Sequence, residues 1–280
     1  MDDSSYSVGC DTPEELTEKL SSVYQDISSY MSANKLILND EKTHLIVFAK
    51  KALSDKREEV FIEAGKHIIK PTATEKLLGC HIAQDGKWKE HILNNKSSLV
   101  KQLNKRLNGL SLVCRRAPFK TKLVVTGGIF LSKLVYLIQV WGGTQEFLLK
   151  ALQVTQNKAM KMVTGLSWFT PTRVLLRKCD WLSVRQLVAY HTLMAMHKTV
   201  VVGRPQYVLI KVTTETHHNT RQLVKFSQNF TGKTDLTQRS FCYRGATLYN
   251  KLPIELTMIA NITSFKRKLK IWVQCNIDID

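Results

Sequence analysis

The chain opens with MDDSSYSV, in which Asp2 and Asp3 stand side by side. Carboxylate oxygens are the ligands that Mg²⁺ prefers, and carboxylates that hold two metal ions support phosphoryl transfer in polymerases. Side chains alternate along a strand, so both aspartates can serve one site only at the tip of a hairpin. Taken alone, two acidic residues at a chain start favour a solvated end over a metal site. The elements that follow must therefore decide between these two interpretations.

The charge of the chain is strongly basic and unevenly distributed. Lysine and arginine number 41 against 23 aspartate and glutamate residues, which gives a net charge of +18. Residues 1–63 hold 7 basic and 13 acidic residues, a net charge of −6, whereas residues 64–280 hold 34 and 10, a net charge of +24. An excess of this size predicts a polyanionic partner, of which nucleic acid is the commonest. A basic surface that only keeps the protein soluble is the alternative.

The cysteines and the apolar segments indicate the compartment. The six cysteines include no CxxC pair, which argues against a zinc ribbon and a disulfide framework and favours a reducing compartment. The best membrane candidate, residues 123–143, is interrupted by Lys133 and two adjacent glycines, so it predicts a buried helical hairpin. No basic start leads into an apolar core, as a secretory signal requires. We therefore expect an intracellular protein of the nucleus or cytoplasm, with no secretion and no membrane partner.

Residues 1–86 predict a small α+β unit. Residues 12–34 carry apolar side chains at helical spacing, with Thr12 as the N-cap and Glu15 completing a capping box. The segments after this helix have the composition of short strands. The expected strands are residues 35–38, residues 44–49, a hairpin around Gly65, and residues 75–82, followed by a turn at Asp85–Gly86.

From residue 87 onward the pattern becomes helical. In residues 91–113 the apolar side chains share one helix face and the lysines lie off it. The further helices expected begin near Pro118, run over residues 144–164 before Gly165, and form a pair within residues 170–200. A Gly-Arg-Pro sequence at residues 203–205 marks a boundary, beyond which the chain ends in an amphipathic basic helix. The predicted fold class is therefore α+β, mostly α.

Several segments occur in the order of one known family. After the two aspartates they are LILNDEKTHLIVF (36–48), KLLGCHIAQDGKWKEHI (76–92), MKMVTGLSWFTPTRVLLRKCDWLSV (160–184) and FCYRGATLYNKLPIELTMIANITSFKRKLKIWV (241–273). No single segment is specific, but their order resembles the C-terminal part of the reverse transcriptase of non-LTR (LINE-type, jockey-like) retrotransposons. The resemblance implies a partial palm over residues 1–86, a helical thumb or connection over 87–202, and a basic C-terminal module over 203–280.

The resemblance also implies roles for residues of the palm. Asp2 and Asp3 match the end of the family's catalytic turn, in which an aromatic and a variable residue precede two aspartates. They would then be remnant catalytic residues and ligands of Mg²⁺. Lys42 would lie near the nucleotide phosphates, as a possible catalytic residue. The alternative for Lys42 is a surface lysine that pairs with its acidic neighbours, Asp40 and Glu41.

Two further groups of residues would contact nucleic acid if the resemblance holds. Leu78, Gly79 and Cys80 would press the primer end through backbone contacts, although a plain strand with a glycine bulge also explains them. A basic thumb face would follow the template–primer through sequence-independent, salt-sensitive phosphate contacts. The basic residues expected in such contacts are Lys96, Lys101, Lys105, Arg106, Arg115, Arg116, Lys266, Arg267, Lys268 and Lys270. The implied partner is an RNA or DNA template–primer, with no small-molecule cofactor.

The sequence departs from the family pattern in one respect. The fingers, the palm strand with the first catalytic aspartate and the aromatic residue before the two aspartates are absent. Mg²⁺ demands near-ideal octahedral geometry, so two aspartates alone would bind it weakly or not at all. We therefore expect a fragment of an RNA-directed DNA polymerase that binds nucleic acid and is catalytically incompetent alone. The alternatives are a complete, active reverse transcriptase whose 5′ end was missed, and a helical protein-interaction scaffold.

Overall fold

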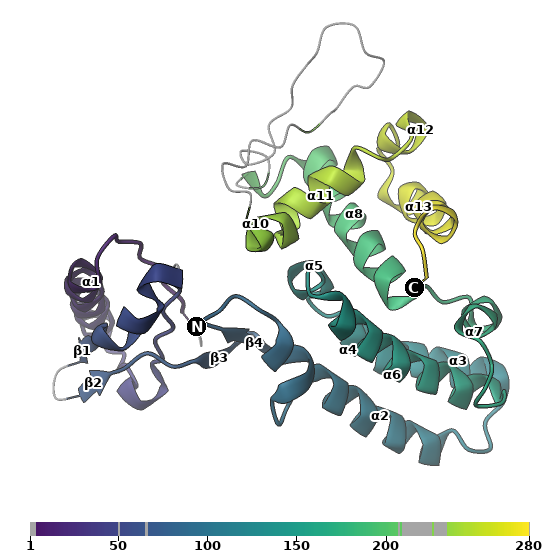
Figure 1. The fold of residues 1–280 in the computed structure, drawn as a ribbon, viewed down its shortest axis with the longest axis horizontal. Helices are drawn as coiled ribbons and strands as arrows, with labels where there is room; N and C mark the ends of the chain where they lie inside the picture. The colour runs from purple at the N-terminus through teal and green to yellow at the C-terminus, as the bar shows by residue number, and fades with distance from the viewer. Residues whose placement is uncertain are drawn as a thin grey trace, which may run out of the picture. The chain divides into compact units, whose positions relative to one another are not determined.

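The structure, a computed structural model, describes residues 4–49, 51–64, 67–206, 208, 226 and 234–279. The chain divides into two compact units, Met1–Glu90 and His91–Asp280, which we call unit 1 and unit 2. Most described residues are helical, and two small antiparallel sheets accompany them, so the predicted class is confirmed at this level (Figure 1). In the part of the chain that is described, no helix has the length and apolar character needed to cross a membrane.

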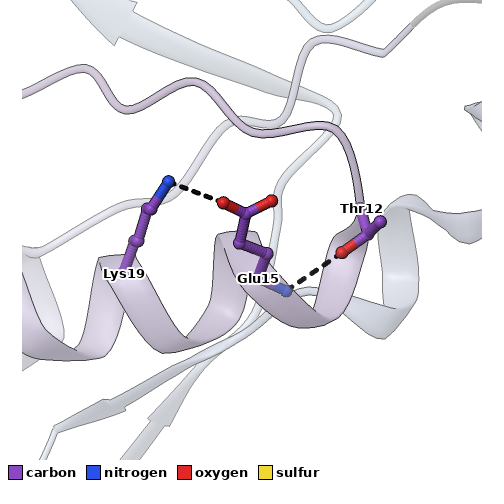
Figure 2. Close-up of polar contacts among 3 residues, drawn as sticks. All are labelled: Thr12, Glu15 and Lys19. Carbon is purple, nitrogen blue, oxygen red and sulfur yellow. Dashed lines mark hydrogen bonds and ion pairs between the residues drawn. The ribbon is translucent and has the colours of Figure 1, made fainter.

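Helix α1, Pro13–Ala33, begins where the sequence predicts. The backbone N–H of Glu15 donates to the Thr12 hydroxyl oxygen at 3.2 Å, which confirms the N-cap (Figure 2). The second half of the predicted capping box is replaced, because the Glu15 carboxylate accepts from Lys19 Nζ at 2.7 Å, one turn along the helix. This pair is exposed, so it adds little to the stability of α1, which rests on its apolar face.

The core of unit 1 forms between α1 and a hairpin. Strand β1, Ile62–Ala64, pairs antiparallel with β2, His67–Ile69, which confirms the hairpin predicted around Gly65. The buried side chains of this core are Leu45, Val47, Val60, Ile62, Ala64 and Ile69, with Leu16, Leu20 and Tyr24 packed against them. The 3-10 segment η2, Lys51–Glu59, connects the two parts of the core.

The strands predicted at residues 35–38 and 44–49 are wrong. Residues 35–38 have no regular structure and lead into a 3-10 turn, η1 (Asp40–Lys42). Within residues 44–49 only Leu45 forms a β-bridge, to Pro71. A strand needs a neighbour that satisfies its backbone groups along its whole length, and a short apolar run does not by itself provide one.

The single strand predicted at residues 75–82 is in fact a hairpin. Strand β3, Thr74–Leu77, pairs antiparallel with β4, Cys80–Ala83. Leu78 and Gly79 form the turn, with φ of 48° and 81°. Positive φ at both central residues is the pattern of a type I′ turn, which glycine allows and leucine disfavours. The turn predicted at Asp85–Gly86 is confirmed, since Gly86 has φ of 67° and its N–H donates to the Ala83 carbonyl oxygen.

The described part of unit 2 consists of α-helices and short π-helices, the latter labelled η. Its elements are η3 (Glu90–Asn94, at the unit boundary), α2 (Leu99–Val113), α3 (Phe119–Thr126), η4 (Gly127–Leu131), α4 (Ser132–Leu134), α5 (Ile138–Trp141), α6 (Glu146–Thr164), α7 (Thr172–Cys179), α8 (Val184–Val202), α10 (Asp235–Arg239), α11 (Phe241–Tyr249), α12 (Ile254–Thr257) and α13 (Ile262–Asn276). The helices predicted near Pro118, before Gly165 and within residues 170–200 are all present. The hairpin predicted at residues 123–143 is wrong, because the two glycines lie inside the π-turn η4 and do not reverse the chain.

Helices α6 and α8 form the centre of unit 2. Helix α6 contacts α2, α3, α7 and α8, and α8 contacts α5, α11 and α13 (Figure 1). Gly142 makes the approach of α5 to α8 possible, because a Cβ there would lie 2.8 Å from Val188 Cγ1. The α11 and α13 helices thus pack directly on α8. The division of the chain at residues 86 and 202 stays a prediction.

His197 joins three segments in the core of unit 2. Its ring is fully buried on α8 and stacks on Phe265 of α13 at a centroid distance of 3.6 Å. His197 Nε2 lies 2.8 Å from the Ile259 carbonyl oxygen, which can only accept, so Nε2 carries the hydrogen. Nδ1 then accepts from the Tyr249 hydroxyl at 3.0 Å. Burial lowers the pKa of His197 below its ordinary value, so the folded chain holds a neutral imidazole.

We expect Leu78→Asn to stabilise the β3–β4 hairpin by about 0.5–1 kcal/mol, because asparagine tolerates positive φ better than leucine. The measurement is hydrogen exchange at the backbone amides of β4, which should slow by a corresponding factor. Leu77→Asn is the matched control, since Leu77 is an exposed strand residue and should give no such protection. Unchanged or faster exchange in Leu78→Asn would contradict the proposed turn geometry.

We expect the neutral state of His197 to make the stability of unit 2 depend on pH. The folded pKa lies below the unfolded value of 6.5, so protonation favours the unfolded chain. The stabilisation is complete above pH 6.5 and is lost as the pH falls below it. Urea unfolding at several pH values should show a smaller loss in His197→Gln than in wild type. His67→Gln is the control at an exposed histidine and should keep the wild-type dependence, whereas equal slopes in all three proteins would exclude this role.

Candidate nucleic-acid interface

Positive charge is concentrated in unit 2. Residues 91–280 hold 29 basic and 7 acidic residues, a net charge of +22, whereas residues 1–90 hold 12 and 16, a net charge of −4. Within residues 91–179, 15 basic residues are accompanied by a single acidic one, Glu146. The Glu146 carboxylate is used within the fold, because it lies 2.6 Å from Arg185 Nη2. The segment from α2 to α7 therefore presents largely uncompensated positive charge, which attracts polyanions.

Helix α2 carries its charges on the side opposite its core face. Its buried side chains, Leu99, Leu103, Leu107 and Leu110, follow one stripe. Lys101 and Lys105 lie one turn apart on the other side and are exposed. Neither lysine forms an ion pair with any of the described residues. Both ammonium groups are therefore available to phosphates.

Arg106 has a different position from the lysines of α2. It lies at the flank of the helix, and its Nη1 donates to the Ile129 carbonyl oxygen of η4 at 2.6 Å. This hydrogen bond fastens α2 to the π-turn and fixes the guanidinium near the surface. Guanidinium has five donors, so the contact leaves others for a ligand.

The loop between α2 and α3 extends the positive surface. Arg115 and Arg116 are exposed there, while Cys114, the C-cap residue of α2 just before them, is buried. Lys120, in the first turn of α3, is also exposed. Lys120 was not predicted from the sequence, although it follows the predicted Arg116 by only four residues.

Helix α13 carries the second predicted group of cations. Phe265, Leu269 and Val273 form its buried stripe against α8, and this leaves Lys266, Arg267 and Lys268 exposed. Lys270 differs, because its Nζ lies 2.6 Å from Asp180 Oδ2 and also donates to the Asp180 carbonyl oxygen at 3.0 Å. Lys270 therefore links α13 to the end of α7, and its charge is compensated within the protein.

The two predicted groups lie on different sides of the helical core. Helix α2 packs on α6 and α13 packs on α8, so α6 and α8 separate them (Figure 1). Helix α7 lies between, since it packs on α6 and its C-cap residue Asp180 pairs with α13. Arg173, Arg177 and Lys178 are exposed on α7 and were missed by sequence reasoning. Only the buried positions of α7 reveal which of its residues point outward.

We call the exposed cations of these helices and their connecting loops the basic set, leaving out Arg106 because it donates to the Ile129 carbonyl oxygen. Its members are Lys96, Lys101, Lys105, Arg115, Arg116, Lys120, Arg173, Arg177, Lys178, Lys266, Arg267 and Lys268. None of them forms an ion pair within the described ranges of the chain. Side chains of this kind bind phosphates without reading base sequence.

The predicted palm residues belong to unit 1. Lys42 is exposed on η1 and its ammonium pairs with no carboxylate of the described residues, so the predicted pairing with its acidic neighbours is absent. Leu78 and Gly79 form the exposed β3–β4 turn, whereas the Cys80 side chain is buried and serves packing.

The predicted metal ligands, Asp2 and Asp3, lie outside the described residues. Among the residues that are described, no group of three histidine, cysteine or acidic side chains is arranged to hold a metal ion. A Mg²⁺ site needs several oxygen ligands in octahedral arrangement.

A cavity of about 380 Å³ lies among α6, α8 and α11, and Gly142, directly after α5, also lines it. Arg244 lines it and donates from Nη2 to the Gln139 carbonyl oxygen at 2.9 Å, which ties α11 to α5. Burial lowers the pKa of Arg244 to about 10. Glu146 and Arg185 also line the cavity and pair with each other at 2.6 Å.

We expect Lys101→Gln with Lys105→Gln to weaken binding of an RNA–DNA duplex and to reduce the magnitude of the salt slope by about 2, since each lost phosphate contact removes about 1. The measurement is fluorescence anisotropy over a series of salt concentrations. The matched control is Lys198→Gln with Lys251→Gln, which removes the same charge from exposed positions of unit 2 outside the basic set. Equal loss in both double variants would show that net charge, and not the α2 surface, determines binding.

Comparisons of the chain with protein-family models, with curated proteins and with solved structures found no match. The candidate interface therefore rests on the position and exposure of its own side chains. The family resemblance rests on the order of the sequence segments quoted above. The exposed side chains and the order of the segments both support the function proposed below.

Proposed function

We propose that the chain binds nucleic acid through the basic set of unit 2. The observation that carries this proposal is the ratio of 15 basic residues to one acidic residue over residues 91–179, together with the exposure of most of those cations. Lysine and arginine side chains without internal partners match a repeated array of phosphates. None of the basic set pairs with a carboxylate of the described residues, so a polyanion can replace the counterions of these cations.

The sequence order supports a more specific form of the proposal. The segments at residues 36–48, 76–92, 160–184 and 241–273 resemble the palm, thumb and C-terminal parts of a non-LTR retrotransposon reverse transcriptase. We propose that residues 87–202 correspond to the thumb or connection of such an enzyme, that residues 203–280 correspond to its basic C-terminal module, and that the partner is an RNA or DNA template–primer. The segments that resemble the family include no fingers, so we propose that the chain alone does not extend a primer.

One observation favours a protein-binding scaffold as a second candidate. Leu112 and Val113 at the end of α2 are 79% and 81% exposed. Apolar side chains at a helix surface suit a partner helix as well as solvent. The two candidates differ in electrostatics, because a protein partner need not be a polyanion. A chain that binds no nucleic acid even at low salt would leave the scaffold as the remaining proposal.

We expect duplex affinity to fall steeply as salt rises. Four phosphate contacts would give a slope of log K against log salt of about −3.6, which weakens binding about 100-fold between about 50 and 200 mM salt. Anisotropy of labelled RNA–DNA and DNA–DNA duplexes measures this directly. A flat salt dependence would contradict phosphate recognition by the basic set.

Primer extension separates this proposal from the active enzyme. With a labelled nucleotide and Mg²⁺ or Mn²⁺, we expect no incorporation by the purified chain at concentrations that saturate binding. Incorporation that disappears in Asp3→Ala would instead establish the chain as a polymerase. The binding measurement on the same Asp3→Ala protein is the control, since the substitution should leave affinity unchanged.

A further inference from the structure

Two large aromatic side chains are exposed on the loop between α6 and α7. Trp168 is 62% exposed and Phe169 is 92% exposed. Leaving such rings in water forgoes roughly 1.5–3 kcal/mol of burial free energy for a side chain of phenylalanine size. Adjacent exposed aromatic residues therefore indicate a surface that a partner covers.

Hydrogen bonds fix this loop near both of its ends. Gly165 ends α6 with φ of 65°, and the Thr170 N–H donates to the Ser167 carbonyl oxygen at 3.1 Å. Lys161, in the last turn of α6, donates from Nζ to the Trp168 carbonyl oxygen. The loop thus holds its two aromatic residues in a defined position and does not leave them on a free segment.

Lys161 also brings a charge to the indole of Trp168. Its Nζ lies 4.4 Å from the ring centroid, within the range of a cation–π interaction. The ammonium covers one side of the ring, and the exposure of Trp168 leaves the remaining surface open to a ligand. Phe169 is not covered by any such contact among the described residues.

The surroundings of the loop are positive. Residues 147–179 contain six basic residues and no acidic residue. Arg173, which follows the loop in the first turn of α7, is exposed and belongs to the basic set. Flat aromatic faces between cations match the two parts of a single-stranded nucleic acid, its unpaired bases and its phosphates.

We propose that Trp168 and Phe169 form a stacking platform for unpaired bases, with Lys161 and Arg173 placed to contact the adjoining phosphates. This inference rests on the proposed function and adds to it a preference for single strands over duplexes. Bases inside a duplex are stacked on each other and present no free face, so the platform should contribute to single-strand binding alone. Because every base has an aromatic face, the platform should accept both RNA and DNA without strong sequence preference.

The test compares a single strand of about 12 nucleotides, as RNA and as DNA, with the matching duplex. The variant is Trp168→Ala with Phe169→Ala, and the control is Phe147→Ala, which removes a half-exposed aromatic side chain from the first turn of α6. We expect single-strand affinity to fall about tenfold or more in the double variant while duplex affinity changes less than about threefold. The control should change neither.

Tryptophan fluorescence gives a second, direct readout. Of the five tryptophans, Trp168 is exposed, Trp141 and Trp181 are buried, and Trp88 and Trp272 are partly buried, so the quenching that disappears when Trp168 is replaced reports on the platform. Trp168→Phe keeps an aromatic face and should retain affinity for the single strand while losing the share of the quenching that Trp168 contributes. This variant also keeps the proposal testable if the double alanine protein folds poorly.

The possible outcomes distinguish a failure of the stacking platform from a failure of the proposed nucleic-acid binding. Equal loss of single-strand and duplex affinity in the double variant, or no loss in either, would overturn the platform while leaving duplex binding by the basic set in place. Full quenching retained in Trp168→Phe would overturn it as well. Absence of binding to every probe at low salt, in the wild-type chain, would instead overturn the proposed function itself.

Discussion

The burial of helices α6 and α8 fixes which sides of the neighbouring helices of unit 2 can carry charge. Helix α8 contacts α5, α6, α11 and α13, and most of its side chains, from Val184 to Thr199, are buried. Each neighbouring helix must turn an apolar stripe toward this centre, as α13 does with Phe265 and Leu269. Its lysines and arginines then have only the outer side available. The positive surface is thus a consequence of core packing, since hydrophobic burial determines which positions remain for charge.

Packing within unit 2 also engages several of its few carboxylates in ion pairs, which leaves fewer of them to offset the charge of the outer cations. Glu146, Asp180 and Asp235 each form an ion pair within the fold, with Arg185, Lys270 and Arg239 respectively. The pair between Asp180 and Lys270 joins residues 90 positions apart and connects α7 with α13. The outer cations therefore lack opposing charges of their own. At physiological salt the Debye length is about 8 Å, so neighbouring cations on one helix still repel each other, and a bound polyanion would relieve that repulsion.

Helices with regular apolar spacing and the β1–β2 hairpin could be predicted from the sequence, but two other short strands were predicted wrongly. The leucine stripe of α2 and the Thr12 cap of α1 are local patterns that the structure confirms. The runs at residues 35–38 and 44–49 look like strands, but strand formation depends on a partner elsewhere in the chain. The Leu78–Gly79 turn escaped prediction because leucine is a poor residue for positive φ.

Prediction of the candidate interface from the sequence was limited in the same way, because the exposure of a side chain depends on tertiary contacts. Lys101 and Lys105 follow from the periodicity of α2, because the buried stripe identifies the opposite side. Arg173 and Arg177 do not, since the outward side of a short helix such as α7 depends on which neighbour covers it. The compensation of Lys270 by Asp180 depends on tertiary contact across two helices, and no sequence pattern contains it. Composition thus predicted a polyanionic partner, and the fold was needed to show where the exposed cations lie.

The most direct test of the account is lysine footprinting of the full chain with and without a saturating RNA–DNA duplex. Acetylation followed by mass spectrometry reports the accessibility of each lysine separately. We predict protection of the lysines of the basic set on four helices, α2, α3, α7 and α13, such as Lys101, Lys120, Lys178 and Lys266. Lys198 and Lys251 should be unchanged. Protection confined to unit 1, or equal protection of Lys198 and Lys251, would contradict it.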